Sequence, residues 1–277
     1  MIDSHCHLNL APLGNNVSET LQLAKQNGVE RIMVPGITPA SWEVLSQYNS
    51  QPYGDILPID TAIGLHPYFL PNDLNEILPL LKLFEKAVAA AVTAANGYSF
   101  NTQGCFSAIG ETGLDSHIAV SMDIQKRVLH AHLDIADSFG LPVILHHRKS
   151  HHLLLEALKT SAFNGRGVIH AFSGSIDVAK CYIDRGFCLG VGGTITYERA
   201  KKTRDTVAHL LRYHPDSILL ETDAPDMPMS GRQGLPNMPH YLKDVVSSLA
   251  ALSGIPPNEI VTMTSINYAR LFKSFPF

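Results

Sequence analysis

The sequence has no excess of positive charge and no paired thiols. It holds 21 Lys and Arg against 25 Asp and Glu, a net charge of −4, and only 17% charged residues. No global positive field can therefore attract a polyanion, and any binding of nucleic acid has to rest on a local site. The cysteines lack C-x-x-C spacing, which indicates buried free thiols in a reducing compartment rather than disulfides or a thiolate metal site. They are Cys6, Cys105, Cys181 and Cys188.

Long apolar stretches are missing as well. The longest run, residues 87–95, is too short to cross a bilayer, and its alanines predict a helix. Near the start, Asp3 and His5 stand where a signal peptide would need an apolar core. We expect a cytoplasmic protein without a membrane contact, and nothing in the sequence indicates an obligate protein partner.

Two further classes of chemistry lack their motifs. The sequence contains neither a G-x-S-x-G nucleophile elbow nor a G-x-x-x-x-G-K-[ST] phosphate loop. The glycine-rich run at residues 190–195 departs from the dinucleotide fingerprint, because its sixth position is Ile195. These absences argue against serine-nucleophile and nucleotide-cofactor enzymes.

The most informative stretch that is present is the opening, Met1 to Leu8. His5 and His7 stand two residues apart after apolar residues, and in an extended strand residues two apart project from the same face. With 14 histidines in 277 residues, roughly 0.7 such pairs are expected by chance. His130 and His132 have the same spacing inside a helical pattern, where they face opposite ways, so we expect those two to be surface or packing residues.

About eight short apolar segments alternate with helical patterns, and no linker marks a domain boundary. Such strands suit a parallel sheet that is buried on both faces. The sequence therefore predicts an α/β protein, a (β/α)8 TIM barrel formed by residues 1–277 as a single domain, with a doubly wound open sheet as the alternative. The clearest strands are expected at residues 30–36, 59–63, 106–111, 142–146, 167–170, 187–190 and 217–223.

Polar side chains gather where these strands end. In a barrel the C-terminal strand ends converge on one mouth, where active sites of this fold lie. Imidazoles and carboxylates buried together would be badly compensated without a cation, and this mixture suits Zn²⁺, Mn²⁺, Co²⁺ or Fe²⁺ and tolerates Mg²⁺. Six ligands, four imidazoles and two carboxylates, exceed one tetrahedral site, and a pair of cations bridged by Glu111 and a water would use them all. The polar residues that gather at the strand ends are His5, His7, His66, Glu111, His146, His170, Glu221 and Asp223.

Other polar residues follow His146. Arg148 lies just beyond a ligand-bearing strand end, where a guanidinium can grip a phosphate or carboxylate, so we predict a substrate contact. Strand alternation predicts that His147 points away from His146. His151 and His152 are expected to begin a helix.

Six motifs at these positions resemble the TatD-type metal-dependent hydrolases of the amidohydrolase superfamily. They are Asp3-Ser4-His5-Cys6-His7, Gly64-Leu65-His66-Pro67, Gly110-Glu111-Thr112-Gly113-Leu114-Asp115, Pro142-Val143-Ile144-Leu145-His146, Val168-Ile169-His170-Ala171-Phe172-Ser173-Gly174 and Leu220-Glu221-Thr222-Asp223-Ala224-Pro225. The resemblance runs over nearly the whole chain in the family's order. It implies a (β/α)8 barrel with two divalent cations (Zn, Mg or Mn) and an activity like that of deoxyribonucleases that trim DNA from its 3′ end.

The resemblance also implies roles for single residues. By resemblance, the residues expected to bind metal are His5, His7, Glu111, His146, His170 and Asp223. Beyond what the resemblance implies, we predict Asp223 and Glu111 as catalytic residues, with Asp223 as the group that accepts the proton of the attacking water. Arg148, His66 and Glu221 are the predicted substrate contacts, and His66 and Glu221 are the next candidates for the base.

One loop departs from the family pattern. The family usually has an Arg-Asn-x-Pro run after strand 8, whereas residues 235–239 keep Asn237 and Pro239 and lack that arginine. The leading hypothesis is a phosphodiester hydrolase that acts on DNA ends or short oligonucleotides, held locally. The alternatives are a small-molecule amide, lactone or phosphoester hydrolase of the same superfamily, which the acidic charge balance also fits, and a metal-binding barrel without catalysis.

Overall fold

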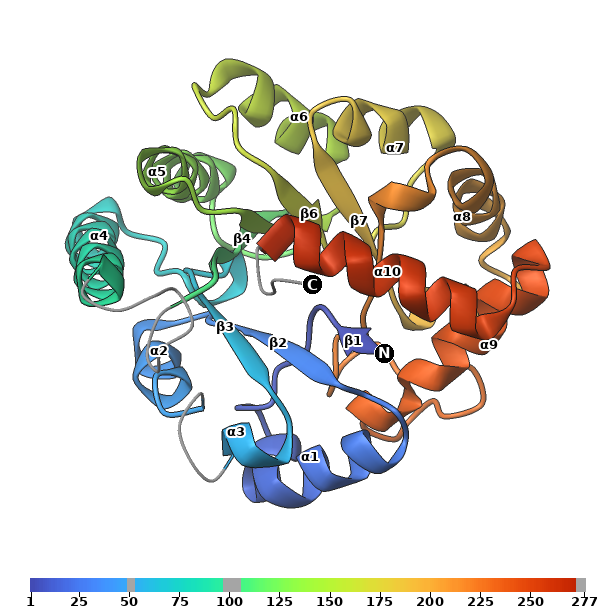
Figure 1. Cartoon of the computed structure of the whole chain (residues 1–277). Coiled ribbons are helices and arrows are strands. Elements are labelled where there is room, and N and C mark those ends of the chain that lie inside the picture. Colours follow the sequence, from blue (N-terminus) through green and yellow to red (C-terminus); the bar gives the residue numbers. More distant parts are fainter. Residues whose placement is uncertain (49–52, 97–105, 273–277) are drawn as a thin grey trace. The chain divides into compact units, whose positions relative to one another are not determined.

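A computed structural model of the chain describes residues 1–48, 53–96 and 106–272. Within these residues strands alternate with helices along the chain (Figure 1). The strands span Ile2–Asp3 (β1), Arg31–Pro35 (β2), Ile59–Ile63 (β3), Ala108–Asp115 (β4), Val143–Arg148 (β5), Gly167–Ile169 (β6), Phe187–Val191 (β7) and Ile218–Leu220 (β8).

The helices follow the strands, with short 3-10 turns between some of them. The α-helices span Val17–Gln26 (α1), Pro39–Leu45 (α2), Tyr53–Ile56 (α3), Leu74–Asn96 (α4), Met122–Phe139 (α5), His151–Thr160 (α6), Ile176–Ile183 (α7), Lys201–Tyr213 (α8), Leu242–Ser253 (α9) and Pro257–Phe272 (α10). Two of the 3-10 turns bear on the site, Pro67–Phe69 after β3 and Gly193–Thr196 after β7.

The sheet confirms the predicted fold class. Its eight strands stand in the order of the sequence, from β1 to β8, and the strand pairs are parallel. The first and last strands are also joined: the N–H of Ser4 donates to the carbonyl of Leu220 at 2.8 Å, and Cys6 forms a parallel bridge with Ala224. The fold is a (β/α)8 barrel.

The chain divides into two compact units. The first comprises residues 1–34, 51–60 and 169–277, and the second comprises residues 35–50 and 61–168. The first unit contains both ends of the barrel sheet, and the second contains the longest strand, β4. The prediction of one domain over residues 1–277 stays a prediction.

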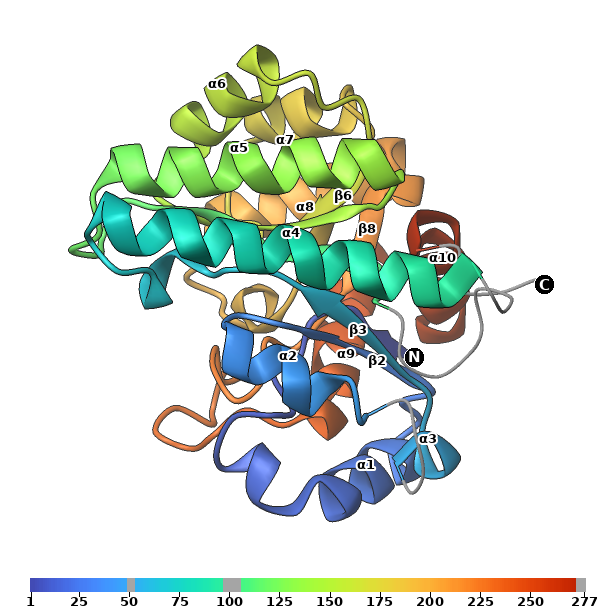
Figure 2. The ribbon, with the colours of Figure 1, turned by 90° about the vertical axis from the view of Figure 1, so that its left-hand side faces the viewer.

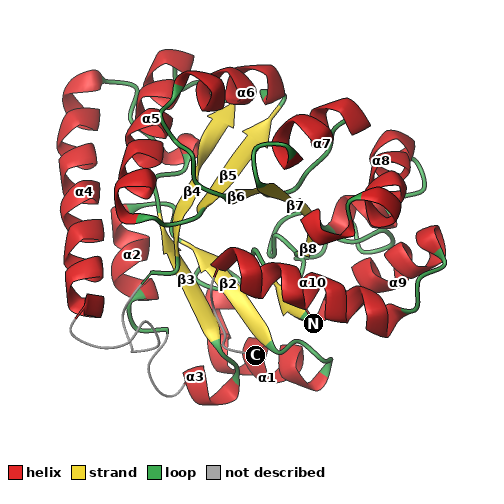
Figure 3. Cartoon of the chain, turned by 45° about the horizontal axis from the view of Figure 1, so that its top comes forward, coloured by secondary structure: helices red, strands yellow, loops and turns green. Residues whose placement is uncertain are grey.

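The second unit is built around β4 and β5, which lie side by side (Figure 3). All eight residues of β4 are buried, as a strand covered on both faces requires. Its register pairs Gly113 with His146 and Asp115 with Arg148. In the same unit α4 and α5 run alongside each other (Figure 2). The helix predicted for residues 87–95 is therefore confirmed as part of α4.

One packing histidine supports this unit from α5. His132 is buried, its ring stacks on Phe84 at a centroid distance of 3.9 Å, and its Nε2 accepts a hydrogen bond from the N–H of Leu65 at 3.0 Å. Its Nδ1 therefore carries the proton and donates to the carbonyl of Val128 at 2.8 Å. The prediction that His132 is a packing residue is confirmed, and the side chain anchors the backbone next to His66.

Replacing His132 is expected to change how stability depends on pH. Burial lowers the pKa of His132 from 6.5 to about 4, despite the opposing bond to Val128. The unfolded chain then binds a proton that the folded chain excludes, so stability is full above pH 6.5 and falls as pH drops toward 4, by roughly 3 kcal/mol in all. The free energy of unfolding, measured with urea between pH 7.5 and 5, should depend less steeply on pH for His132→Gln than for the natural chain.

The half-exposed His130 of the same helix offers the matched control for this experiment. His130→Gln should keep the pH dependence of the natural chain. Parallel stability curves for the natural chain and His132→Gln would contradict the prediction.

Several sequence-based boundaries and one burial prediction were wrong. The first strand ends at Asp3, before His5 and His7, and β8 ends at Leu220, before Glu221 and Asp223. At these two strand ends the regular strand stops before the candidate metal-binding residues, whereas Glu111 lies inside β4 and His146 inside β5. Cys181 is exposed, whereas Cys6 and Cys188 are buried free thiols as expected, and Cys105 lies outside the described residues. No helix in the described ranges has the length and apolarity to cross a bilayer.

Candidate metal centre

The first unit holds a cluster of two imidazoles and a carboxylate. The Nε2 atoms of His5 and His7 lie 3.2 Å apart. The Oδ1 of Asp223 lies 3.5 Å from the Nε2 of His5 and 3.7 Å from that of His7. All three residues are buried. The predicted pairing of His5 and His7 on one side of the chain therefore holds, although neither residue lies in β1.

The spacing of these atoms tests whether a cation fits. Ligands held at about 2.0 to 2.1 Å around a tetrahedral ion lie roughly 3.3 Å from one another. The separations of 3.2, 3.5 and 3.7 Å agree with that value. Neutral imidazoles and an ionised carboxylate are also the donors that Zn²⁺ and Mn²⁺ accept. The donor set fits a divalent cation.

His170 joins this cluster through His5. Their rings stack at a centroid distance of 4.0 Å, and His5, His170 and Asp223 each offer a ligand atom to a common ion. On its other side, the Nδ1 of His170 lies 3.7 Å from the Oε1 of Glu221. A carboxylate behind a metal-binding imidazole fixes the ring's orientation and raises its basicity.

Glu221 is held where a substrate cannot reach it directly. Its relative exposure is 0%, and its Oε1 accepts a hydrogen bond from the N–H of Ala171 at 2.6 Å. A Cβ at Gly190 would collide with the carboxylate, so the glycine of β7 provides the room for this side chain. This placement supports an orienting role toward His170, and the predicted substrate contact stays a prediction.

The backbone conformation of Asp223 sets the direction of its side chain. Its φ is +58°, a left-handed conformation that Asp and Asn adopt more readily than most residues. The neighbouring Thr222 donates its N–H and its hydroxyl to the buried carboxyl of Asp3, at 2.9 and 2.6 Å. Burial raises the pKa of Asp3 to about 8, against the lowering effect of these bonds. Asp3 thus fastens the end of β8 to the end of β1.

The second unit holds another cluster, centred on Glu111. Its Oε1 lies 2.9 Å from the Nδ1 of His146 and 3.3 Å from the Nε2 of His66. Glu111 is buried, and the three residues together offer ligand atoms for one ion. The Nδ1 of His66 accepts the N–H of Tyr68 at 3.1 Å, so the neutral ring carries its proton on Nε2. In that tautomer His66 donates a hydrogen bond rather than a metal-binding lone pair.

Asp115, which was not identified from the sequence, is a member of this cluster and contacts both His146 and Arg148. Its Oδ2 lies 3.5 Å from the Nε2 of His146 and 4.0 Å from the guanidinium of Arg148. Burial alone would raise the pKa of Asp115, but the bond to His146, the N–H of His117 and the charges of His146 and Arg148 together lower it. The signal was present in the spacing, because positions 111 and 115 share a face of one strand.

Close backbone contact between β3 and β4 helps to place Glu111 near His66. A Cβ at Gly64 would come within 2.5 Å of the carbonyl carbon of Gly110. Gly64 allows the strand ends to approach so closely, since a side chain there would force them apart, and a Cβ at Gly110 would meet Ile144 of β5 at 2.7 Å. The glycines of the Gly-Leu-His-Pro and Gly-Glu-Thr-Gly motifs therefore serve the geometry of the cluster.

The neighbours of His146 lie as alternation predicts. His147 is buried and stacks on His151 at a centroid distance of 4.1 Å, and α6 begins at His151. The Arg148 side chain is 62% exposed. It is therefore accessible to a ligand, with Asp115 as a distant ion-pair partner.

A (β/α)8 barrel with clustered imidazoles and carboxylates after its strands defines the class: a metal-dependent enzyme of the barrel type. The chain belongs to the family described as TatD related DNase, whose model matches residues 2–273. It is a metal-dependent hydrolase of that family.

Individual relatives agree with this assignment. The uncharacterized metal-dependent hydrolase YjjV of Escherichia coli K12 is 37% identical over 273 residues, covering 98% of this chain and 97% of the relative. An uncharacterized metal-dependent hydrolase of Haemophilus influenzae is 33% identical over 279 residues, with 98% of both chains covered. The crystal structure of YjjV, a TatD homologue, superimposes with a TM-score of 0.84 at 35% identity and covers 100% of this chain and 98% of the other.

Proposed function

We propose that the chain is a deoxyribonuclease that hydrolyses phosphodiester bonds at DNA ends or in short oligonucleotides, removing nucleotides from the 3′ end. The observation that carries the proposal is the spacing of 3.2 to 3.7 Å among His5, His7 and Asp223, which suits a divalent cation. Membership in a family described as TatD related DNase supports the choice of substrate.

We propose two divalent cations per chain, Zn, Mg or Mn, held by six residues that lie in strands of the barrel or follow them. When bound, such cations activate water and stabilise the charge that develops on the phosphate. The donor chemistry of the two clusters supports this ligand set. Its members are His5, His7, Glu111, His146, His170 and Asp223.

The chain's own residues have distinct proposed roles around the phosphate. Asp223 accepts the proton of the attacking water, and Glu111 is the second proposed catalytic residue, which would hold a cation together with His146. His66, with its proton on Nε2, donates to an oxygen of the substrate, and Arg148 grips the phosphate. Glu221 orients His170. That residues 1–277 form one hydrolase domain and that it works in the cytoplasm stay predictions.

The direct test is to remove the metal from the protein and to measure substrate hydrolysis before and after a cation is restored. Labelled single-stranded DNA and a small phosphodiester are offered with Mg²⁺, Mn²⁺ or Zn²⁺ added back. We expect shortening of the DNA from its 3′ end only when a cation is restored. Hydrolysis of the small phosphodiester alone would reject DNA as the substrate.

Arg148→Lys is expected to lower kcat/KM for DNA by about tenfold, because an ammonium cannot reproduce the planar fork that binds two phosphate oxygens. Arg127→Lys, at an exposed position of α5, is the matched control and should change nothing. Initial rates over a range of DNA concentrations measure both variants. Near natural rates for Arg148→Lys would remove this residue from the substrate site.

The second candidate is a small-molecule amide, lactone or phosphoester hydrolase. The net charge of −4 favours it, since no broad positive surface is available to attract DNA. A panel of esters, lactones and amides in the same metal add-back experiment separates the two candidates. Retained metal without turnover of any substrate would support a barrel without catalysis.

A further inference from the structure

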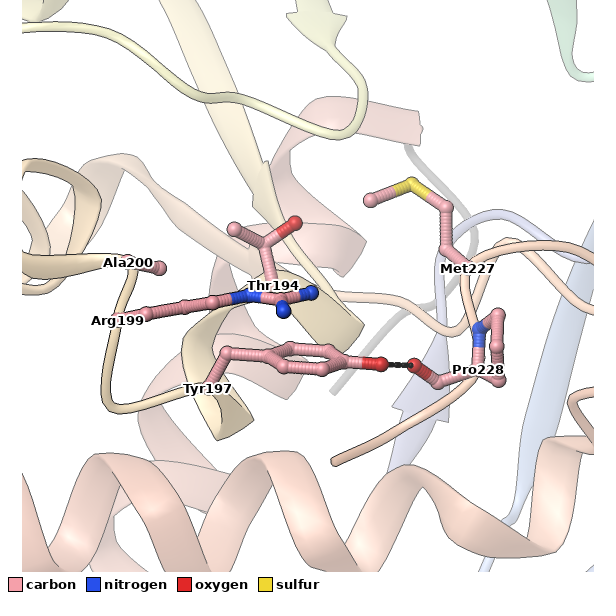
Figure 4. A pocket seen from close by; sticks show the side chains of 6 residues that line it. All are labelled: Thr194, Tyr197, Arg199, Ala200, Met227 and Pro228. Atoms are coloured by element: carbon pink, nitrogen blue, oxygen red, sulfur yellow. Dashed lines mark hydrogen bonds between the residues drawn. The ribbon is translucent and has the colours of Figure 1, made fainter. Parts of the chain in front are cut away.

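A small pocket lies in the first unit between the loop after β7 and the loop after β8 (Figure 4). Its volume is about 250 Å³. One wall consists of Tyr197 and Arg199, and the opposite wall consists of Met227 and Pro228. Thr194 and Ala200 complete the lining. The pocket therefore combines an aromatic ring, a guanidinium, a thioether and a proline ring.

Hydrogen bonds between the two loops fix the shape of this pocket. The hydroxyl of Tyr197 donates to the carbonyl of Pro228 at 2.7 Å, as the dashed line in Figure 4 marks. The N–H of Ser230 donates to the hydroxyl of Thr196 at 2.8 Å. From α8, the Arg204 side chain donates to the carbonyl of Ile195 at 2.6 Å and supports the loop after β7. The walls are thus formed before any ligand arrives, which lowers the entropic cost of binding.

Arg199 is available to a ligand. Its guanidinium carbon lies 4.8 Å from the centre of the Tyr197 ring, so the cation extends over the ring face (Figure 4). No carboxylate among the described residues forms an ion pair with it, and the side chain is exposed. One face of the guanidinium is covered by tyrosine, while its edge and other face remain for a ligand.

The same loop connects the pocket to the metal-binding cluster. Met227 follows Asp223 by four residues, which limits the distance between their Cα atoms to roughly 14 Å even for an extended chain. The N–H of Asp226 donates to the carbonyl of Asp223 at 2.8 Å. The buried amide of Asn237 donates to the carbonyls of Thr222 and Met227, at 2.8 and 3.2 Å. One substrate molecule can therefore reach both places.

We propose that this pocket binds the unpaired nucleobase of a nucleotide next to the bond that is cleaved. The inference rests on the proposed deoxyribonuclease function. Planar bases stack on aromatic rings and on arginine planes, and sulfur and proline surfaces cover their edges. The volume lies below the roughly 300 Å³ at which pockets for drug-sized ligands begin, so it admits one base and no base pair.

The proposal predicts how the enzyme treats its substrate. A base that is held by stacking is recognised with little regard to sequence, since every base has a π-face. It must also leave the duplex first, which favours single-stranded ends. Specificity for single strands would then come from the loops after β7 and β8 rather than from the metal ligands.

Arg199→Ala tests the pocket, with Arg212→Ala as the matched control. Arg212 also lies over a tyrosine, 5.3 Å from the ring of Tyr213, but it belongs to α8. The substrates are an oligothymidylate, the same oligonucleotide with an abasic residue next to the 3′ terminal bond, and a small phosphodiester. Loss of base stacking should raise KM of Arg199→Ala for the intact oligonucleotide by about 5- to 50-fold and leave kcat within twofold.

The other two substrates separate the explanations. The abasic oligonucleotide should be a poor substrate of the natural protein, with a high KM. The Arg199→Ala substitution should not raise the KM for this abasic oligonucleotide further. An equal rise in KM for intact and abasic oligonucleotides would overturn the inference, because Arg199 would then hold a phosphate. Unchanged kinetics of Arg199→Ala on an oligonucleotide that the natural protein cleaves would overturn the inference alone. Hydrolysis of the small phosphodiester without any oligonucleotide cleavage would overturn the proposed function and the inference together.

Discussion

Asp223→Asn is expected to lower turnover of phosphodiesters by at least roughly 10²-fold and by as much as 10⁴-fold, the usual value of general-base assistance. The amide keeps the shape and one ligand oxygen of the aspartate but cannot accept the proton of the attacking water. Asn also adopts the left-handed backbone conformation seen at this residue, φ +58°, so the loop should keep its structure. Turnover is measured after the variant has been loaded to the metal content of the natural protein.

Asp226→Asn is the control for this experiment. Asp226 is an exposed carboxylate of the same loop, three residues beyond Asp223, and its loss should leave turnover within twofold. If Asp223→Asn turned over phosphodiesters within a few-fold of the natural protein at equal metal content, the base would have to be another group, with His66 as the next candidate because Glu221 is buried behind His170.

His170→Ala and His5→Ala are expected to remove metal with little loss of fold. Residues at the mouth of a barrel serve chemistry more than stability. Elemental analysis after dialysis should show that each variant has lost at least one equivalent of metal, while the unfolding midpoint stays close to that of the natural chain. Unchanged stoichiometry in both variants would reject the proposed ligand set.

A graded comparison makes the metal experiment sharper. Glu221→Gln removes only the charge behind His170, and loss of such an outer partner typically lowers metal affinity by about 10- to 100-fold. His170→Ala should lower it further. His209→Ala, at a half-exposed position of α8, is the matched control and should keep full metal content. If Glu221→Gln bound metal with the same affinity as the natural protein, Glu221 would not contribute to metal binding through His170.

The alternation of apolar strands and helices was sufficient to predict the barrel. Each strand buries most of its residues, and most strands contain or adjoin a short apolar run that propensity and pattern both identify. The polar residues after the strands stood out against those runs, and this contrast located the two clusters. Position along a strand thus carried most of the information about the site.

The sequence could not predict the directions of the side chains where strands end. Strand alternation does not apply to Asp223, because its left-handed backbone re-aims the carboxylate. Asp3 was part of a recognised motif, yet its partner Thr222 lies 219 residues away. Contacts of this kind depend on the closure of the sheet, which no local pattern encodes.

The bond between Asp3 and Thr222 also bears on how the protein is made. At about 5 to 20 residues per second, the ribosome needs roughly 10 to 40 s to proceed from one partner to the other. During that time His5 and His7 have been synthesised but Asp223 has not. Residues 35–50 and 61–168, which are complete earlier, already contain the whole Glu111 cluster. The cluster that includes Asp223 is therefore among the last parts of the nascent chain to assemble, and premature termination before β8 leaves a chain that has His5 and His7 but lacks the proposed base.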